Sequence, residues 1–169
     1  APEPTVQAEP PINKIEPQPH PHASAVAARQ STSRSLELDF KRLSARGFLT
    51  SADERGKLAE EYRMIKRPLL ANAFGPNPVR KGNLIMVSSA LPGEGKSFST
   101  INLAISIAME LDRTVLLVDA DVAKPSLPHY LGFQAEHGLL DVLRGESRDL
   151  SDAILRTNIE KLSILPAGK

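Results

Sequence analysis

The stretch Ala90-Leu91-Pro92-Gly93-Glu94-Gly95-Lys96-Ser97 decides the fold class of this chain. It follows an apolar segment, residues 83–89, that is typical of a buried strand, and it precedes a helical pattern over residues 98–111. A glycine-rich turn between a strand and a helix points backbone N–H groups at phosphate oxygens, and the helix N-terminus adds partial positive charge. The sequence therefore predicts a P-loop NTPase, an α/β fold whose parallel sheet is flanked by helices.

Two side chains of this loop carry the expected chemistry. Lys96 would reach the β- and γ-phosphates of a nucleotide, and the Ser97 hydroxyl would ligate Mg²⁺. The usual motif begins with glycine, whereas this loop begins with Ala90, which is small enough for the turn if its φ stays negative. A plain glycine-rich turn between two core elements is the alternative. The residues expected to bind the nucleotide are Pro92, Gly93, Glu94, Gly95, Lys96, Ser97 and Phe98.

A pair of carboxylates follows the next expected strand. Residues 114–118 form an aliphatic run, and Asp119 and Asp121 come directly after it. Alternation along a strand gives both side chains the same facing, at the sheet edge where α/β proteins bind ligands. Asp119 would act there as the base or direct the metal, Asp121 would support the metal, and Lys96 completes the expected catalytic set. A helix-capping or turn pair of aspartates is the alternative.

Composition excludes several classes of protein. The 169 residues suggest one domain, and a net charge of +1 gives no field that would attract nucleic acid, which we do not expect as a partner. The absence of cysteine excludes disulfides and thiolate zinc sites. No apolar run approaches the roughly 18 residues of a membrane-spanning helix.

The character of the sequence changes twice along the chain. Half of the 14 prolines lie in the first 21 residues, which contain no aromatic side chain, so residues 1–34 are expected to form a disordered, Pro-rich linker. Residues 35–78 are expected to form a helical segment. Residues 79–169 are expected to form the P-loop core.

The helical segment is expected to contain two helices. Residues 39–46 form a short one, closed by Gly47. A longer one, capped by Ser51 or Asp53, would end or bend near Pro68. On the longer helix a charged stripe recurs at helical spacing, and it is either a solvated face or a subunit contact. The stripe consists of Glu60, Arg63 and Lys66 or Arg67.

These motifs together resemble the bacterial tyrosine autokinases of exopolysaccharide synthesis and export. The resemblance rests on the sequence of the loop from Ser89 to Ser97 and on a second run, Asp119-x-Asp121-x-x-Lys124-Pro125. This second run is similar to the family's second, modified Walker A motif. The family usually has arginine where this chain has Lys124, which keeps the charge but lacks the planar fork. The run over residues 61–70 is most similar to the exosortase-associated subgroup.

The resemblance implies an ATP-dependent protein-tyrosine autokinase that uses Mg²⁺ and regulates exopolysaccharide polymerisation or export. Glu60-x-x-Arg63-x-x-Lys66 is similar to the family's oligomerisation helix, with lysine for the last arginine. These three residues would dock on a neighbour's nucleotide site, so that subunits of a homo-oligomer phosphorylate one another. The protein would be cytoplasmic and recruited to the inner face of the plasma membrane by a polysaccharide co-polymerase, or chain-length regulator.

Two family features are not found in these 169 residues. No further hydrophobic strand ending in aspartate, the Walker B element, follows Asp121, and the only tyrosines are Tyr62 and Tyr130. The chain is therefore expected to be the amino-terminal part of a kinase domain, incomplete at its C-terminus. Tyr62 is expected to pack against other residues and not to be a phosphorylation site.

Two other functions stay open. The first is an ATPase switch of the partition or septum-positioning type, without kinase activity, which shares the fold. Those proteins usually carry a lysine where this loop has Leu91, which argues against them. The second is a catalytically silent fragment that acts through binding alone, because part of the expected site is missing.

Overall fold

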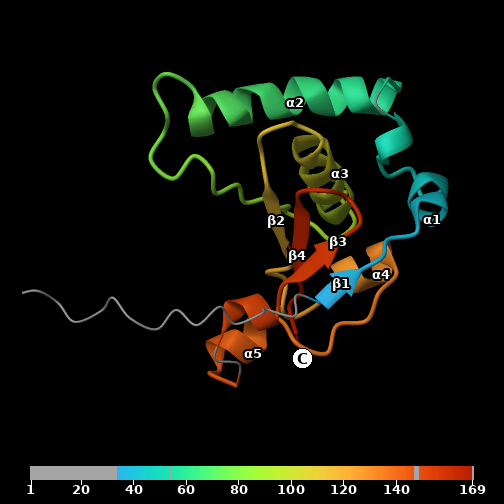
Figure 1. Ribbon diagram of the computed structural model, residues 1–169, viewed down its shortest axis with the longest axis vertical. Coiled ribbons are helices and arrows are strands. Elements are labelled where there is room, and N and C mark those ends of the chain that lie inside the picture. Colours follow the sequence, from blue (N-terminus) through green and yellow to red (C-terminus); the bar gives the residue numbers. More distant parts are fainter. Residues whose placement is uncertain (1–33, 54, 147–148, 169) are drawn as a thin grey trace, which may run out of the picture. The chain divides into compact units, whose positions relative to one another are not determined.

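The computed structural model describes residues 34–53, 55–146 and 149–168. The expected disordered linker, residues 1–34, lies outside the described residues except for Arg34. The described chain forms a four-stranded sheet with helices packed against it (Figure 1). No helix in this part of the chain has the length and apolar character that crossing a lipid bilayer requires.

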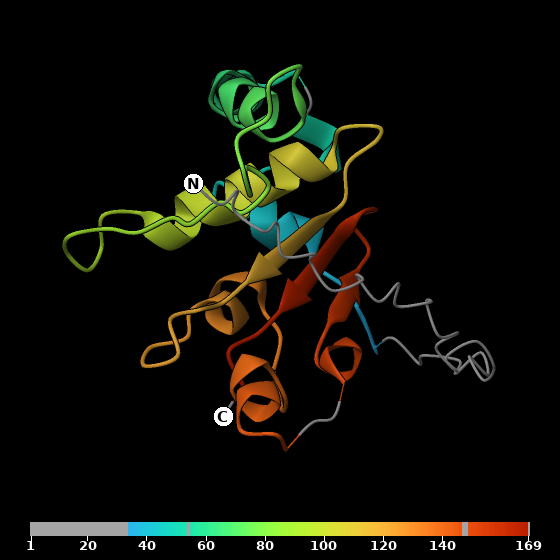
Figure 2. The ribbon, with the colours of Figure 1, turned by 90° about the vertical axis from the view of Figure 1, so that its left-hand side faces the viewer.

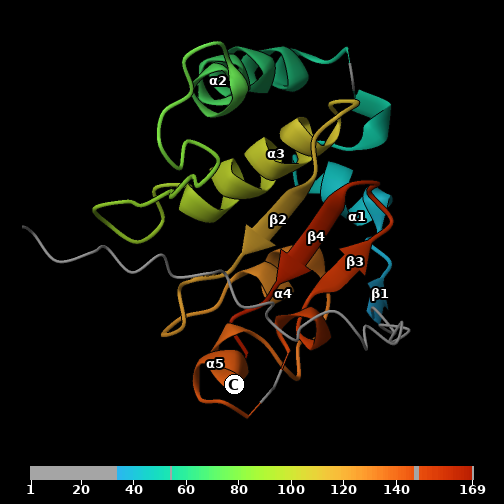
Figure 3. The same cartoon turned by 60° about the vertical axis from the view of Figure 1, so that its left-hand side comes forward.

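The sheet is mixed, whereas the sequence predicted parallel strands only. Its strands, in spatial order, are β1 (Arg34–Leu36), β3 (Leu155–Thr157), β4 (Leu162–Leu165) and β2 (Val115–Val118) (Figure 3). β1 pairs with β3 and β2 with β4 in parallel, but β3 and β4 are antiparallel. Only residues 158–161 connect β3 to β4, which is enough for a hairpin but too short for the crossover that parallel strands need.

The strand expected over residues 83–89 is not formed. Residues 84–89 are irregular, and the side chains of Leu84 and Met86 are 70% and 90% exposed. A strand is stable only beside a partner that satisfies its backbone groups, and this segment pairs with none of the four described strands. The prediction was wrong because an apolar run indicates only that a segment can form a strand. It does not show that another strand is available to pair with it.

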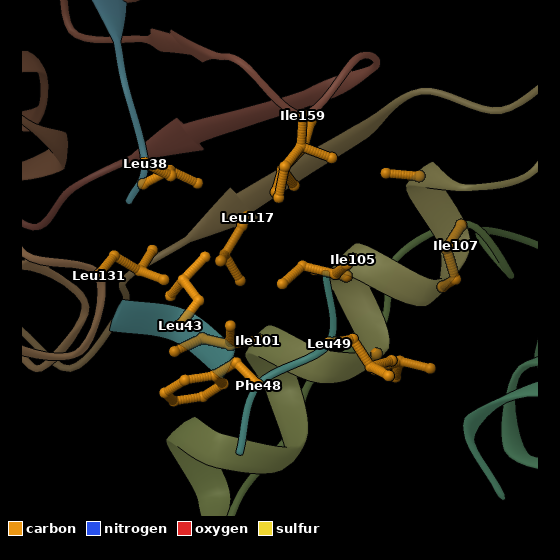
Figure 4. Close-up of a cluster of buried hydrophobic side chains, with 14 of the residues drawn as sticks. Leu38, Leu43, Phe48, Leu49, Ile101, Ile105, Ile107, Leu117, Leu131 and Ile159 are labelled. Carbon is orange, nitrogen blue, oxygen red and sulfur yellow. The ribbon is translucent and has the colours of Figure 1, made fainter. Parts of the chain in front are cut away.

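The helix that follows the loop is the centre of the core. It is α3 (Lys96–Ala108), and every residue from Ile101 to Ala108 is buried. Its aliphatic side chains meet those of the sheet, with Ile101 and Ile105 facing Leu117 of β2 (Figure 4). Because α3 runs back along β2, its first turn lies at the carboxyl end of that strand (Figure 3).

Two helices precede the loop. Asp39 caps α1 (Phe40–Ala45) by accepting hydrogen bonds from the backbone N–H groups of Lys41 and Arg42, and Gly47 follows the helix with a φ of 78°. This confirms the short helix predicted from the sequence. The second helix, α2 (Lys57–Phe74), has Gly56 as its N-cap, so neither Ser51 nor Asp53 caps it. Those two residues instead bound a short 3-10 turn.

α2 continues through Pro68, contrary to the expectation that it would end or bend there. It runs on to Phe74 and is drawn as one continuous helix across the top of Figure 1. Proline removes one backbone hydrogen bond, but the freed carbonyl belongs to Met64, whose side chain is on the exposed side of the helix. Beyond the proline, Leu69 and Leu70 pack against the core and hold the last turns.

Short helices complete the described chain. α4 (Leu127–Leu131) ends at Gly132, whose φ is 79°, and α5 (Leu139–Leu143) is followed by a 3-10 turn at Leu150–Asp152. α5 is attached to the chain beyond β4, since Leu139 and Leu140 donate backbone hydrogen bonds to the carbonyls of Pro166 and Ala167. Figure 2 shows α5 at the same end of the sheet to which the β2 arrow points. The short helices and connecting loops therefore gather at the carboxyl ends of β2 and β4.

Candidate functional site

The phosphate loop is open at its glycines. Gly93 and Gly95 have φ angles of 87° and 88°, a left-handed backbone that glycine adopts without strain. At both positions, no atom other than those of the glycine and its immediate chain neighbours lies within 4 Å of the place that a Cβ would occupy. Gly95 is also the N-cap of α3, and no side chain caps this end of the helix. An uncapped helix start beside an open glycine loop is the arrangement that binds phosphate.

Two of the expected nucleotide-binding residues use their side chains elsewhere. Glu94 Oε2 accepts a hydrogen bond from the backbone N–H of Leu91 at 3.0 Å, which closes the loop on itself. The ring of Phe98 packs against that of Phe48, with 5.2 Å between their centroids. Only the backbone groups of Glu94 and Phe98 are therefore available to a phosphate, and Pro92, which has no N–H, only shapes the exposed turn.

The structure brings together the lysine of the loop and the second aspartate. Lys96 Nζ lies 2.9 Å from Asp121 Oδ2, and both side chains are partly exposed. The Lys96 ammonium and the backbone N–H of Lys124 hold the pKa of the Asp121 carboxyl below its usual range. The two motifs, 25 residues apart in the sequence, thus form one polar site.

Asp119 is linked to the phosphate loop through Ser126, a residue that was not predicted from the sequence. Asp119 is 5% exposed, and its Oδ2 accepts the backbone N–H groups of Ser126 and Leu127 at 2.9 and 3.0 Å. Ser126 in turn shares a hydrogen bond with Ser97, with 2.8 Å between the two hydroxyl oxygens. Asp119 therefore caps α4, as the capping alternative predicted. A signal for Ser126 exists in the sequence, because a serine followed by Leu-Pro is a common helix start.

The oxygen ligands at this site suit a magnesium ion that is bound together with a nucleotide. They do not suit a metal ion that is held by protein side chains alone. The described residues contain no group of three or more His, Cys, Asp or Glu side chains that would hold a metal ion. Mg²⁺ at a nucleotide site keeps several waters and takes oxygen from phosphates, so it needs only one or two protein ligands. The Ser97 hydroxyl and the nearby carboxylates of Asp119 and Asp121 fit that sparse requirement.

The charged stripe on α2 is divided between two environments. Glu60 and Arg63 form an ion pair with each other, and their side chains are 57% and 38% exposed. Lys66 is buried instead, and its Nζ lies 2.6 Å from both Glu110 Oε1 and the Ser106 carbonyl oxygen at the far end of α3. Tyr62 is 7% exposed and belongs to the core, which confirms its expected packing role.

Comparison with known proteins agrees with this geometry. A family profile described as NUBPL iron-transfer P-loop NTPase, of the ParA type, matches residues 80–160. The chimerical protein CapA2B2 superimposes with a TM-score of 0.57 at 26% identity, over 78% of this chain and 54% of that one. The kinase domain of VpsO gives a TM-score of 0.52 at 29% identity, over 71% of this chain and 57% of that one. This chain is a P-loop NTPase by fold.

Relatives of this chain are named as bacterial tyrosine kinases. Tyrosine-protein kinase YwqD of Bacillus subtilis is 31% identical over 123 residues, which are 73% of this chain and 49% of YwqD. Succinoglycan biosynthesis transport protein ExoP of Rhizobium meliloti is 36% identical over 114 residues, 68% of this chain and 14% of ExoP. The chain thus spans about half of YwqD and a smaller part of ExoP. These names support the resemblance to the tyrosine autokinases.

Proposed function

We propose that this chain forms the nucleotide-binding part of an ATP-dependent bacterial protein-tyrosine autokinase that regulates exopolysaccharide polymerisation or export. The observation that carries the proposal is the contact between Lys96 and Asp121, because it joins the phosphate loop to the second motif in one site. The named kinases among the relatives supply the reaction class. Within this family, we assign the chain to the exosortase-associated subgroup, as the sequence of residues 61–70 suggests.

Each residue has a role in this proposal. Bound ATP would supply the phosphoryl group, with Mg²⁺ as its counter-ion. The backbone of residues 93–97 binds the phosphates, and Lys96 moves from Asp121 to the phosphate oxygens, since its exposed ammonium can exchange one anionic partner for another. Ser97 holds the metal, Asp121 supports it, and Asp119 positions α4 or directs the metal through its second oxygen.

The assembly is also part of the proposal. The protein would act on the cytoplasmic side of the plasma membrane, as a homo-oligomer bound to a membrane polysaccharide co-polymerase. The relative ExoP is named as a transport protein of succinoglycan biosynthesis, which supports that setting. The side chains of Glu60 and Arg63 on α2 are partly exposed, so a neighbouring subunit could contact them. Lys66 would have to leave its contact with Glu110 to take part, so we assign the subunit contact first to the other two residues.

The test is phosphotyrosine formation by the full-length parent protein. Wild type incubated with Mg²⁺ and ATP should become labelled on tyrosine, and Lys96→Met should reduce the labelling by at least 100-fold, because the loop loses its phosphate contact. Lys57→Met is the matched control, since Lys57 is an exposed lysine on α2 and should leave labelling unchanged. ATP hydrolysis without any tyrosine labelling would refute the kinase.

A second candidate is an ATPase switch without kinase activity, and the match to the ParA-type profile favours it. Leu91 stands where such switches usually carry a lysine, which places this candidate second. Hydrolysis that depends on Lys96 in the absence of labelling would support it. A silent binding module is the outcome if neither wild type nor Lys96→Met binds Mg²⁺-nucleotide.

A further inference from the structure

We propose that Ser126 orients the Ser97 hydroxyl for magnesium, and that Arg46 holds α4 in the position that this requires. The inference rests on the proposed nucleotide site, but not on the kinase reaction. It adds two positioning residues to that site: Ser126, which directly follows the second motif, and Arg46, from the segment before α2. Neither lies in a nucleotide-binding motif.

The first step is the hydrogen bond between the two serines. A hydroxyl has one proton to donate and two lone pairs that accept or ligate. When Ser97 donates its proton to Ser126 Oγ at 2.8 Å, the lone pairs of Ser97 are left for the metal. A partner that fixes the orientation of a metal ligand in this way contributes 10–100-fold to metal affinity in other proteins.

The second step is the fixed position of Ser126 itself. Its backbone N–H and that of Leu127 both donate to Asp119 Oδ2, and Asp119 follows directly on β2. Ser126 is therefore tied at two points, through its amide to the sheet and through its hydroxyl to the first turn of α3. The start of α4 is thus locked onto the loop and the strand that form the site.

The third step is the opposite end of α4, which Arg46 holds. One guanidinium nitrogen, Nη1, donates to the carbonyl oxygens of His129 at 2.9 Å and Tyr130 at 3.1 Å. The other, Nη2, lies 3.2 Å from His129 Nε2, and the guanidinium carbon is 5.3 Å from the centre of the Tyr130 ring. The last carbonyls of a helix have no partner within it, so an arginine that binds two of them fixes the helix end. A five-residue helix has little stability of its own and depends on such contacts.

The fourth step joins Arg46 to the phosphate-loop helix. Phe48 packs against Phe98 of α3 and also, edge to face, against Tyr130 of α4 at 5.9 Å. The backbone N–H of Leu49 donates to Asn102 Oδ1 of α3 at 2.7 Å. Residues 46–49 therefore touch both helices that carry the serine pair, and Figure 4 shows Phe48 beside Ile101 of α3. A displacement of this segment would change the distance between Ser97 and Ser126.

The experiment compares nucleotide affinity with and without magnesium, using ADP and the 169-residue chain in a calorimetric titration. Wild type should bind Mg²⁺–ADP more tightly than ADP in EDTA. Ser126→Ala should weaken Mg²⁺–ADP binding by about 10-fold and leave binding in EDTA within twofold, whereas Ser126→Thr, which keeps the hydroxyl, should restore the magnesium effect. Ser99→Ala, which alters an exposed serine of α3, is the control and should match wild type.

Arg46→Ala should also reduce the gain in affinity that magnesium gives. Arg46→Lys should recover only part of that gain, because lysine has no second nitrogen for His129 Nε2 and no planar group to lie over the Tyr130 ring. Arg156→Ala, an exposed arginine on β3, controls for loss of charge. If wild type binds ADP with a magnesium effect that Ser126→Ala retains, the inference is wrong and the nucleotide site stands. If Ser126→Ala or Arg46→Ala weakens binding equally in EDTA, the residue is merely structural and the inference is also wrong. If wild type binds no nucleotide, the proposed function fails, and the inference fails with it.

Discussion

The buried contact between Lys66 and Glu110 leads to an asymmetric prediction about stability. The Lys66 side chain is 7% exposed and the Glu110 side chain 41%, so the two partners depend on the contact to different degrees. Glu110→Ala would leave the ammonium with one protein acceptor, the Ser106 carbonyl. Removing one member of a buried ion pair costs about 3–5 kcal/mol, and we expect about 2–3 kcal/mol here because water can reach the vacated place.

The reverse substitution should cost less. Lys66→Met keeps the apolar stem packed against α3, and the half-exposed Glu110 carboxylate can be hydrated. The main loss is the hydrogen bond to the Ser106 carbonyl, one of the unpaired carbonyls at the end of α3, which corresponds to about 1 kcal/mol. The double variant should be more stable than Glu110→Ala alone, because it removes the unpaired cation.

Urea unfolding followed by circular dichroism provides the measurement. With a slope of about 2 kcal/mol per molar urea, Glu110→Ala should lower the midpoint by about 1–1.5 M and Lys66→Met by about 0.5 M. Glu61→Ala removes the exposed pair between Lys57 and Glu61 on the same helix, and it should cost less than about 0.5 kcal/mol. If Glu110→Ala lowers the free energy of unfolding no more than Lys66→Met does, then Lys66 is not a buried cation and the reasoning is refuted.

Three further predictions concern pH, the proline of α2 and solubility. Lys96 lowers the pKa of Asp121, and the backbone N–H of Gly138 lowers the pKa of Asp141. Both carboxylates therefore stabilise the folded state at neutral pH and lose this effect as the pH falls below about 4. In acid titrations, the difference in the free energy of unfolding between wild type and Asp141→Asn should become smaller as the pH falls below about 4. Pro68→Ala should raise the free energy of unfolding by about 1 kcal/mol or more, as measured by urea unfolding, because α2 already continues through this position and would regain a hydrogen bond. The Met86 side chain is 90% exposed, so Met86→Lys should reduce light scattering at high protein concentration. It should change the free energy of unfolding by less than about 0.5 kcal/mol. Unchanged scattering would show that residues 84–89 do not drive self-association.

Features that depend on neighbouring residues were predicted well from the sequence. Asp39 and Gly47 mark the two ends of α1, because capping involves only backbone groups within a few residues. The phosphate loop is predicted for the same reason, since its glycines and the helix start are contiguous. The site between Lys96 and Asp121 needed one further argument, that ligands bind at the carboxyl ends of strands, and the observed contact agrees with it.

Features that depend on distant residues were missed. The apolar run over residues 83–89 predicted a strand, but pairing is a property of two segments, and a single run contains only one of them. Helical spacing placed Lys66 on a charged stripe, whereas its burial depends on Glu110, which lies just beyond the end of α3. Ser126 was overlooked because its importance comes from contacts with Asp119 and Ser97, which the fold brings together.

The pairing of β1 has a consequence for the order of folding. The backbone N–H of Leu38, between β1 and α1, donates to the Asn158 side chain 120 residues away. Closing so long a loop costs entropy that local contacts do not, so contacts of this separation form late. The hairpin of β3 and β4 needs only residues 155–165 and can form early. The contacts of Arg46 with α4 span 83 and 84 residues, so we expect them to form after the hairpin as well. The outer support of the nucleotide site would then be one of the later parts of the chain to assemble.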